Sequence, residues 1–264
     1  SALEHVDELD KITSIGQYAF MGCTALKSIG SLHNLETIGK GAFNGCSALE
    51  HVDDLYSLTR LEYDVFSHCV SLISVDCSDK LTAIGSSAFF GCKALVSIGD
   101  LSNVTSIESS VFRGCIALKS IGNMPKLESI GMQCFMGCTA LETVGDLSSL
   151  KEIPSETFDG CTSLVSIGDL SNVTIIGSYG FNQCKKLTSI PNLGSLESVN
   201  QFAFSGCESL ALLGNLRKLT SFGYSPFVNS PFHNCPNLVL EVLPDSAAEQ
   251  YAKDYNMQYT YITE

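Results

Sequence analysis

The 264-residue chain predicts a solenoid, in which about ten or eleven units of 23 residues form successive coils of a single domain over residues 1–264. Three observations lead to this prediction: a cysteine column of fixed period, a phenylalanine three residues before each cysteine, and an apolar frame in steps of three. Self-similarity at one fixed period is the signature of units that stack on their neighbours. The regular column consists of Cys23, Cys46, Cys69, Cys92, Cys115, Cys138, Cys161, Cys184 and Cys207.

The apolar frame favours neither a long helix nor a long strand, because it holds neither a 3.6-residue nor a two-residue period for long. A coil that turns inward at intervals explains it. Each inward side chain then meets its equivalent in the coils above and below, and a single unit cannot bury enough surface to fold alone. The first full unit contributes Phe20, Cys23, Leu26, Ile29, Leu32, Leu35 and Ile38.

Glycine occupies three recurrent places in the unit. It precedes the cysteine, as Gly91 does, and it follows the first and second isoleucine-type positions, as Gly99 and Gly85 do. These places predict turns that need a positive φ or a close approach of the backbone.

The core of the unit resembles a known family. Residues 88–98 read A-F-F-G-C-K-A-L-V-S-I, which is similar to the BspA-like (Treponema pallidum type) leucine-rich repeats. The resemblance covers residues 3 to about 243 and implies an α/β solenoid, a right-handed leucine-rich-repeat superhelix with a short parallel concave sheet. The family usually has an apolar-proline pair after the isoleucine, whereas this chain has Gly-Asp-Leu or Gly-Asn-Met, so the following turn is expected to differ.

The regular repeat is expected over residues 1–243, with an irregular insertion near 224–231, where Cys207 and Cys235 are 28 residues apart. A C-terminal cap is expected over residues 244–264. Ser246 and Glu249 match a capping box before a helix-like pattern, and alternating apolar residues over 257–261 predict a last strand. Such a cap would cover the apolar face and strand edge of the last coil.

Composition and motifs exclude several classes of function. The net charge of −13 disfavours nucleic acid, because no basic stripe exists to neutralise phosphates. No run approaches the roughly 18 apolar residues of a membrane span, so membrane insertion is not expected. No catalytic, nucleotide-binding or metal-binding motif is present, so we expect neither an enzyme nor a cofactor or metal. His68 beside Cys69 is interpreted as a turn residue rather than a catalytic partner.

The chain has twelve cysteines. Those in the column, with Cys235 as its tenth member, are expected to point inward as free thiols, because parallel neighbours offer poor disulfide geometry. Cys134 and Cys77 fall outside the column. Cys77 stands where other units have Asp or Asn, so it is predicted to be the most exposed and reactive thiol.

A column that is mostly Asp or Asn follows the expected concave strand. Its side chains have three interpretations: contact with a basic protein segment, a shared cation, or hydrogen bonds that cap local turns. Asp53, Asp54, Asp76, Asp100, Asp146 and Asp169 would form an acidic strip. The candidate protein-binding face consists of His51, Asp53, Asp54, Asp76, Asp100, Asn123, Asp146, Asp169 and Asn192.

The resemblance implies a protein-binding or adhesion module, secreted or on the cell surface, with a protein ligand such as a host extracellular matrix or surface protein. A rigid, preformed surface would lose little freedom on binding. One alternative is a structural spacer or scaffold without its own ligand. Another is a thiol-based sensor or enzyme that uses Cys77.

Overall fold

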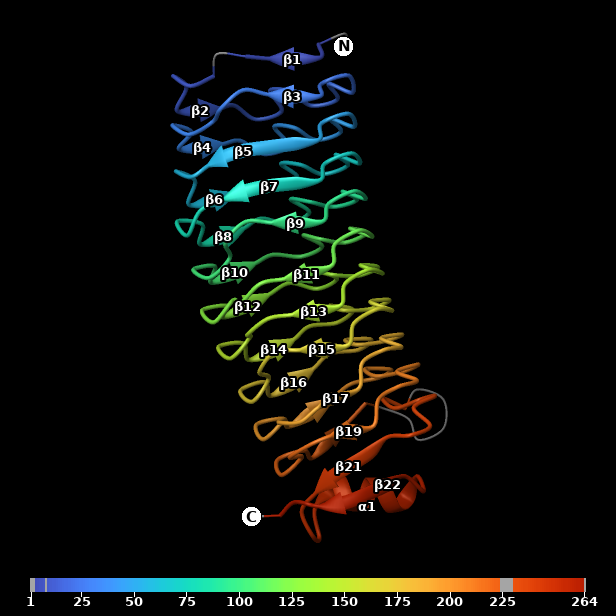
Figure 1. Ribbon diagram of the computed structural model, residues 1–264. Helices are drawn as coiled ribbons and strands as arrows, with labels where there is room; N and C mark the ends of the chain where they lie inside the picture. The colour runs from blue at the N-terminus through green and yellow to red at the C-terminus, as the bar shows by residue number, and fades with distance from the viewer. Residues whose placement is uncertain (1–2, 8, 224–229, 264) are drawn as a thin grey trace.

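The computed structural model describes residues 3–7, 9–223 and 230–263, which form a stack of parallel coils with the two termini at opposite ends (Figure 1). The coils contribute short strands to two rows, each divided into several short sheets, and we call these rows the first and second ladders. Every strand pair in the described residues is parallel. Partner residues in most pairs are 23 positions apart, as Ser106 and Ser129 are. The predicted solenoid of stacked repeat units is therefore confirmed.

The first ladder contains the odd-numbered strands and the last strand, and it carries the expected concave strand of each unit. Its strands are β1 (His5–Val6), β3 (Ser28–Ile29), β5 (His51–Leu55), β7 (Ser74–Cys77), β9 (Ser97–Ile98), β11 (Ser120–Ile121), β13 (Thr143–Val144), β15 (Ser166–Ile167), β17 (Ser189–Ile190), β19 (Leu212–Leu213), β21 (Val239–Val242) and β22 (Gln258–Tyr261).

The second ladder comes from the second isoleucine-type position of the unit, for which the sequence analysis expected no strand. Its strands are β2 (Ser14–Ile15), β4 (Thr37–Ile38), β6 (Arg60–Leu61), β8 (Ala83–Ile84), β10 (Ser106–Ile107), β12 (Ser129–Ile130), β14 (Glu152–Ile153), β16 (Ile175–Ile176), β18 (Ser198–Val199) and β20 (Ser221–Phe222).

The glycine sets divide by physical role. A Cβ added to Gly39, after a second-ladder strand, would lie 2.5 Å from the backbone nitrogen of Gln17 in the preceding coil, so only glycine fits there. Gly91, before a cysteine, has a φ of +71°, which side chains disfavour. His68 takes the same turn position with a φ of +59°, which confirms its interpretation as a turn residue.

Stacked phenylalanine rings fill the centre of the coils. Phe112 lies between Phe89 and Phe135 with ring centroids 5.4 and 5.2 Å apart, and all three side chains are fully buried. Similar spacing continues along the stack from Phe20 to Phe204. Each ring therefore depends on two copies of itself for its packing.

The cysteine column joins one coil to the next. The Cys115 thiol donates a hydrogen bond of 3.1 Å to the carbonyl oxygen of Phe89 in the preceding coil, and the same contact recurs from Cys46 to Cys235. All twelve cysteines lie within the described residues and are free thiols, as predicted. Burial raises the pKa of Cys92 to about 12, so the thiolate is disfavoured.

The prediction of an exposed, reactive Cys77 is wrong. Its side chain is only 8% exposed and belongs to the hydrophobic core. Cys77 pairs with Leu55 rather than with Asp54, because the strand register shifts between Val52 and Leu55. Ser78 holds the repeat position at which the other units have leucine or, once, methionine. Because Ser78 is polar, the register shift places the Cys77 thiol in the core in its stead. Burial, then the nearby Asp76, raises the pKa of Cys77 to about 12.

A helix and a strand cover the last coil, as predicted. Helix α1 (Ala247–Asp254) begins at Ser246, whose hydroxyl accepts a 3.2 Å hydrogen bond from the Glu249 backbone N–H. Glu249 Oε2 accepts from the Asp245 backbone N–H at 2.8 Å, and the hydroxyl of Tyr261 donates to its Oε1 at 2.6 Å. β22 pairs in parallel with β21. Of the expected insertion, residues 224–229 lie outside the described residues.

Phe112→Ala is expected to lower the free energy of unfolding by about 3–5 kcal/mol, because it leaves a cavity that the rings above and below cannot close. Urea unfolding measures the change. Met132→Ala is the control, since Met132 is 55% exposed and its truncation should change stability by about 0.5 kcal/mol or less. Equal effects of the two substitutions would contradict the stacked interior.

Thiol labelling of the native protein with a maleimide is expected to modify the half-buried Cys23 and Cys235 first. Cys77 should react as slowly as Cys92, because burial withholds both thiols and suppresses their thiolates. Mass spectrometry of peptides from a time course locates the label. Selective early labelling at Cys77 would restore the sensor interpretation, and labelling in urea checks that every thiol is able to react.

Glu249 predicts how acid affects the cap. Lys253, then the Tyr261 hydroxyl, lowers the pKa of Glu249 to about 2, from the ordinary value of 4.5. A lowered pKa stabilises the fold above about pH 4.5, and this contribution is lost as the pH falls toward 2. Glu249→Gln should therefore lower the thermal midpoint at neutral pH, and the difference from wild type should shrink across that window. Glu142→Gln, an exposed carboxylate, should show no such convergence.

Candidate functional site

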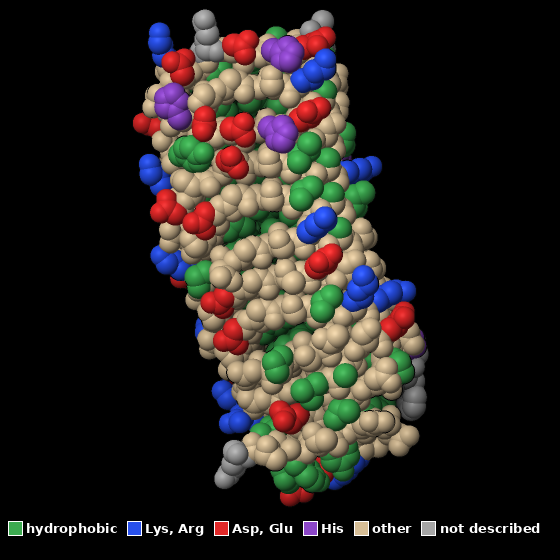
Figure 2. Space-filling view, in the orientation of Figure 1, with side chains coloured by type: hydrophobic (Ala, Val, Ile, Leu, Met, Phe, Trp, Pro, Cys, Tyr) green, Lys and Arg blue, Asp and Glu red, His purple; other side chains and the backbone are tan. Residues whose placement is uncertain are grey.

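The candidate binding residues lie in strands of the first ladder or two residues after them. Asp53 and Asp54 belong to β5, and Asp76 belongs to the adjacent β7. We call these three residues the acidic cluster. Figure 2 shows that acidic and histidine side chains gather on this face over the N-terminal coils, whereas uncharged side chains dominate farther along. The predicted strip is thus concentrated at one end.

A bulge in β5 shapes the acidic cluster. The register shift between Val52 and Leu55 places Asp54 at a φ of +65°, a conformation that Asp tolerates better than most residues. Its carboxylate accepts a 2.6 Å hydrogen bond from the Ser31 hydroxyl of the preceding coil. Asp53 and Asp76 are exposed. The cluster therefore combines one hydrogen-bonded carboxylate, that of Asp54, with two carboxylates that face solvent.

Tyr56 lies beside the acidic cluster and was not among the residues predicted from the sequence. Desolvation raises the pKa of its phenol, and the negative charges of Asp54 and Asp76 raise it further. Its side chain is nonetheless 45% exposed. Aromatic side chains that combine an apolar ring with a polar tip are common at protein interfaces. The signal in the sequence is an aromatic residue two positions after Asp54, where three later units have serine.

His51 lies beside the cluster in β5, and its Nδ1 is 3.0 Å from the hydroxyl of Ser74 in β7. The two asparagines of the candidate face lie farther along the stack. Asn123 accepts a 3.0 Å hydrogen bond from the Asp146 backbone N–H, and Asn192 accepts one of 2.8 Å from Asn215. These amides connect successive coils.

The remaining aspartates of the strip cap their own turns. Asp100 accepts a 2.8 Å hydrogen bond from the Ser102 backbone N–H, and Asp146 and Asp169 make the same contact with the residue two positions later. Such side-chain-to-backbone bonds stabilise turns. The local interpretation of the column therefore holds for these three residues, and it leaves the acidic cluster as the distinctive part of the face.

Charge in the cluster is not balanced by neighbouring cations. Within residues 3–7, 9–223 and 230–263, none of the six aspartates of the strip forms an ion pair with lysine or arginine. In the same ranges, no group of three or more His, Cys, Asp or Glu side chains is placed to hold a metal ion.

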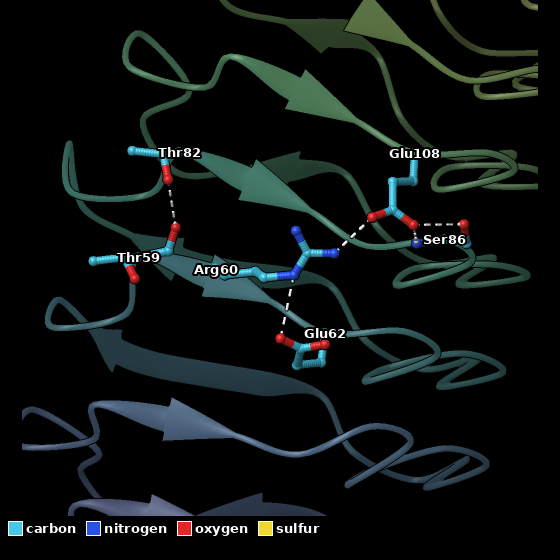
Figure 3. A network of polar contacts seen from close by, with 6 residues as sticks. All are labelled: Thr59, Arg60, Glu62, Thr82, Ser86 and Glu108. Carbon is cyan, nitrogen blue, oxygen red and sulfur yellow. Dashed lines mark hydrogen bonds and ion pairs between the residues drawn. The ribbon is translucent and has the colours of Figure 1, made fainter.

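Part of the second ladder carries an ion-pair network that joins its coils (Figure 3). Arg60 in β6 donates to Glu108 at 2.6 Å, two coils away, and lies 3.2 Å from Glu62. Glu108 also accepts hydrogen bonds from the backbone N–H and hydroxyl of Ser86 at 3.2 and 2.9 Å. Nearby, the Thr82 hydroxyl donates to the Thr59 carbonyl oxygen at 3.0 Å. This network links successive coils, and Arg60 offsets part of the negative charge of Glu62 and Glu108.

Solved structures similar to this chain include bacterial leucine-rich repeat proteins. A leucine rich cell surface protein from Faecalibacterium prausnitzii A2-165 is 23% identical, with a TM-score of 0.50, and 95% of this chain and 81% of that chain are covered. A leucine-rich repeat protein from Eubacterium ventriosum ATCC 27560 is 19% identical, with a TM-score of 0.52 and coverages of 88% and 86%. The T. pallidum leucine rich repeat protein is 22% identical, with a TM-score of 0.50 and coverages of 71% and 79%.

Identities this low establish the fold alone. No curated protein matches the chain. In the described part of the chain, no helix combines the length and apolar character needed to cross a membrane.

The family of BspA type leucine rich repeat regions matches residues 1–119 and 105–239, in six copies. These matches span most of the chain and coincide with the coils described above. The chain therefore belongs to the family of BspA type leucine-rich repeat proteins.

Proposed function

We propose that this chain is a protein-binding module that recognises a basic segment of another protein through the acidic cluster on the first ladder. The observation that carries the proposal is the set of carboxylates at Asp53, Asp54 and Asp76, which no lysine or arginine of the described residues neutralises. Charge complementarity of this kind steers association and selects partners.

The surroundings of the cluster fit protein contact. Tyr56 offers an exposed aromatic ring beside the carboxylates, and aromatic anchors carry a large share of interface energy. The carboxylates project from paired strands of a stacked sheet rather than from a loop. A surface held in this way loses little conformational freedom when a partner binds, so modest contacts suffice for measurable affinity.

Adhesion at a cell surface is the biological setting that we propose, with secreted or surface-anchored forms of the parent protein. The support is membership of the BspA type family and the F. prausnitzii neighbour, which is described as a cell surface protein. An extracellular matrix or surface protein of a host with an exposed run of lysine and arginine is the partner class that fits the acidic cluster.

A pull-down against purified extracellular matrix and cell-surface proteins tests the proposal. The triple variant Asp53→Asn, Asp54→Asn and Asp76→Asn should weaken binding by about 3-fold to 150-fold, because three lost charge pairs at roughly 0.2–1 kcal/mol each remove about 0.6–3 kcal/mol. Asparagine preserves shape and tolerates the positive φ of Asp54. Higher salt should weaken wild-type binding in the same direction.

The matched control removes three exposed carboxylates from in and around the second ladder, through Glu128→Gln, Glu152→Gln and Glu197→Gln. It changes the net charge equally and should leave binding intact. Equal losses in both variants would show that net charge, not the cluster, drives association. Full binding by the cluster variant would refute the site, and a wild-type chain that binds no protein of the panel would favour a spacer role.

A further inference from the structure

A groove of about 430 Å³ lies along the phenylalanine-glycine-cysteine turns, outside the acidic cluster and the second-ladder network. We call it the turn groove. Its lining side chains combine apolar groups with cations, and none of the lining residues is acidic. The side chains that define its chemistry are His68, Val70, Phe90, Lys93, Arg113 and Met136.

Glycine backbone forms part of the lining of the groove. Gly91, Gly114 and Gly137 repeat at the same turn position, each with a positive φ, and present no side chain. A Cβ added to Gly114 would lie 3.9 Å from the Gly91 Cα, so Gly114 lies directly over Gly91. In the preceding coil His68 takes this position, and its ring lies 3.1 Å from where a Gly91 Cβ would be. His68 therefore closes one end.

One wall of the groove consists of planar side chains in contact with one another. The His68 ring meets Phe90 edge-on, with centroids 5.0 Å apart and planes at 83°. The guanidinium carbon of Arg113 lies 5.7 Å from the centre of the Phe90 ring, a cation–π distance. Arg113 Nη1 also donates to Gln133 Oε1 at 2.8 Å, which fixes the guanidinium and leaves its other donors for a ligand.

The cations of the groove have no anionic partner among the described residues. Over the part of the chain that the structure describes, neither Arg113 nor Lys93 forms an ion pair. The whole chain carries a net charge of −13, whereas the charged side chains that line this groove, Lys93 and Arg113, are both basic. An anion is the ligand that complements this site, and arginine binds carboxylates through paired N–H donors.

We propose that the turn groove binds a small carboxylate that carries an aromatic or branched aliphatic group. The apolar group would pack against Val70, Phe90 and Met136, and the carboxylate would accept hydrogen bonds from Arg113 and Lys93. The volume falls in the range of small-molecule sites, which are mostly apolar with a few placed polar groups. This ligand differs from the basic protein segment proposed for the acidic cluster, and the two sites use different repeat columns.

Fluorescence titration with 8-anilinonaphthalene-1-sulfonate tests the site, since this probe joins aromatic rings to an anion. N-phenyl-1-naphthylamine has the same ring system without the anion. Arg113→Gln and Lys93→Gln should each raise the Kd of the anionic probe about tenfold, because each removes a charge-assisted contact, and should leave the neutral probe nearly unchanged. 4-Phenylbutyrate should displace the anionic probe from wild type.

Lys185→Gln is the matched control, because Lys185 holds the same repeat position as Lys93 but pairs with Glu208 at 3.2 Å, away from the groove. It should leave both titrations unchanged. Equal affinity of the anionic probe for wild type and Arg113→Gln, or equal losses in Lys93→Gln and Lys185→Gln, would overturn the proposal. Salt supplies a test without variants: if added salt weakens both probes alike, the groove does not select an anion.

Discussion

Close contact between successive coils is the constraint on which the rest of this structure depends. Where a coil leaves a second-ladder strand, the backbone of the next coil comes so near that a Cβ at Gly39 would overlap Gln17. Parallel strands lie about 4.8 Å apart, and the phenylalanine rings adopt slightly larger spacings of 5.2–5.4 Å around Phe112. Buried cysteine thiols bond to the preceding coil in the same step. One repeat distance thus satisfies backbone, rings and thiols together.

That constraint explains what could be predicted from the sequence. An interior position must suit identical neighbours, so it repeats, and the period predicted the buried sides of Phe43 and Cys46 correctly. Cys77 was predicted wrongly because it lies one 23-residue period after Asp54, whereas its partner in the adjacent strand is Leu55. Burial of an apolar group decided the register there, and a count of residues from one unit to the next does not detect such a shift.

At the candidate site, too, the position of a residue in the repeat is not enough to predict its contacts. Asp54 and Asp100 hold equivalent repeat positions, yet Asp100 caps a turn through Ser102 whereas Asp54 accepts a hydrogen bond from Ser31 in the neighbouring coil. A residue type at a repeat position therefore does not fix its role, because the role depends on the residues beside it. Tyr56, rather than serine, lies two positions after Asp54, and this difference distinguishes the acidic cluster from the turn-capping aspartates.

A solenoid also allows two sites of opposite charge to coexist in one small domain. Exposed side chains do not pack in the core, so the residue at one surface column of a unit can change without disturbing another column. The acidic cluster uses residues in and beside first-ladder strands, and the turn groove uses residues before and after the column cysteines. In water with physiological salt, exposed charges are largely screened beyond about 8 Å, so two sites separated by more than this distance act nearly independently. Independent columns on a rigid stack would therefore allow the two proposed sites to be occupied at once.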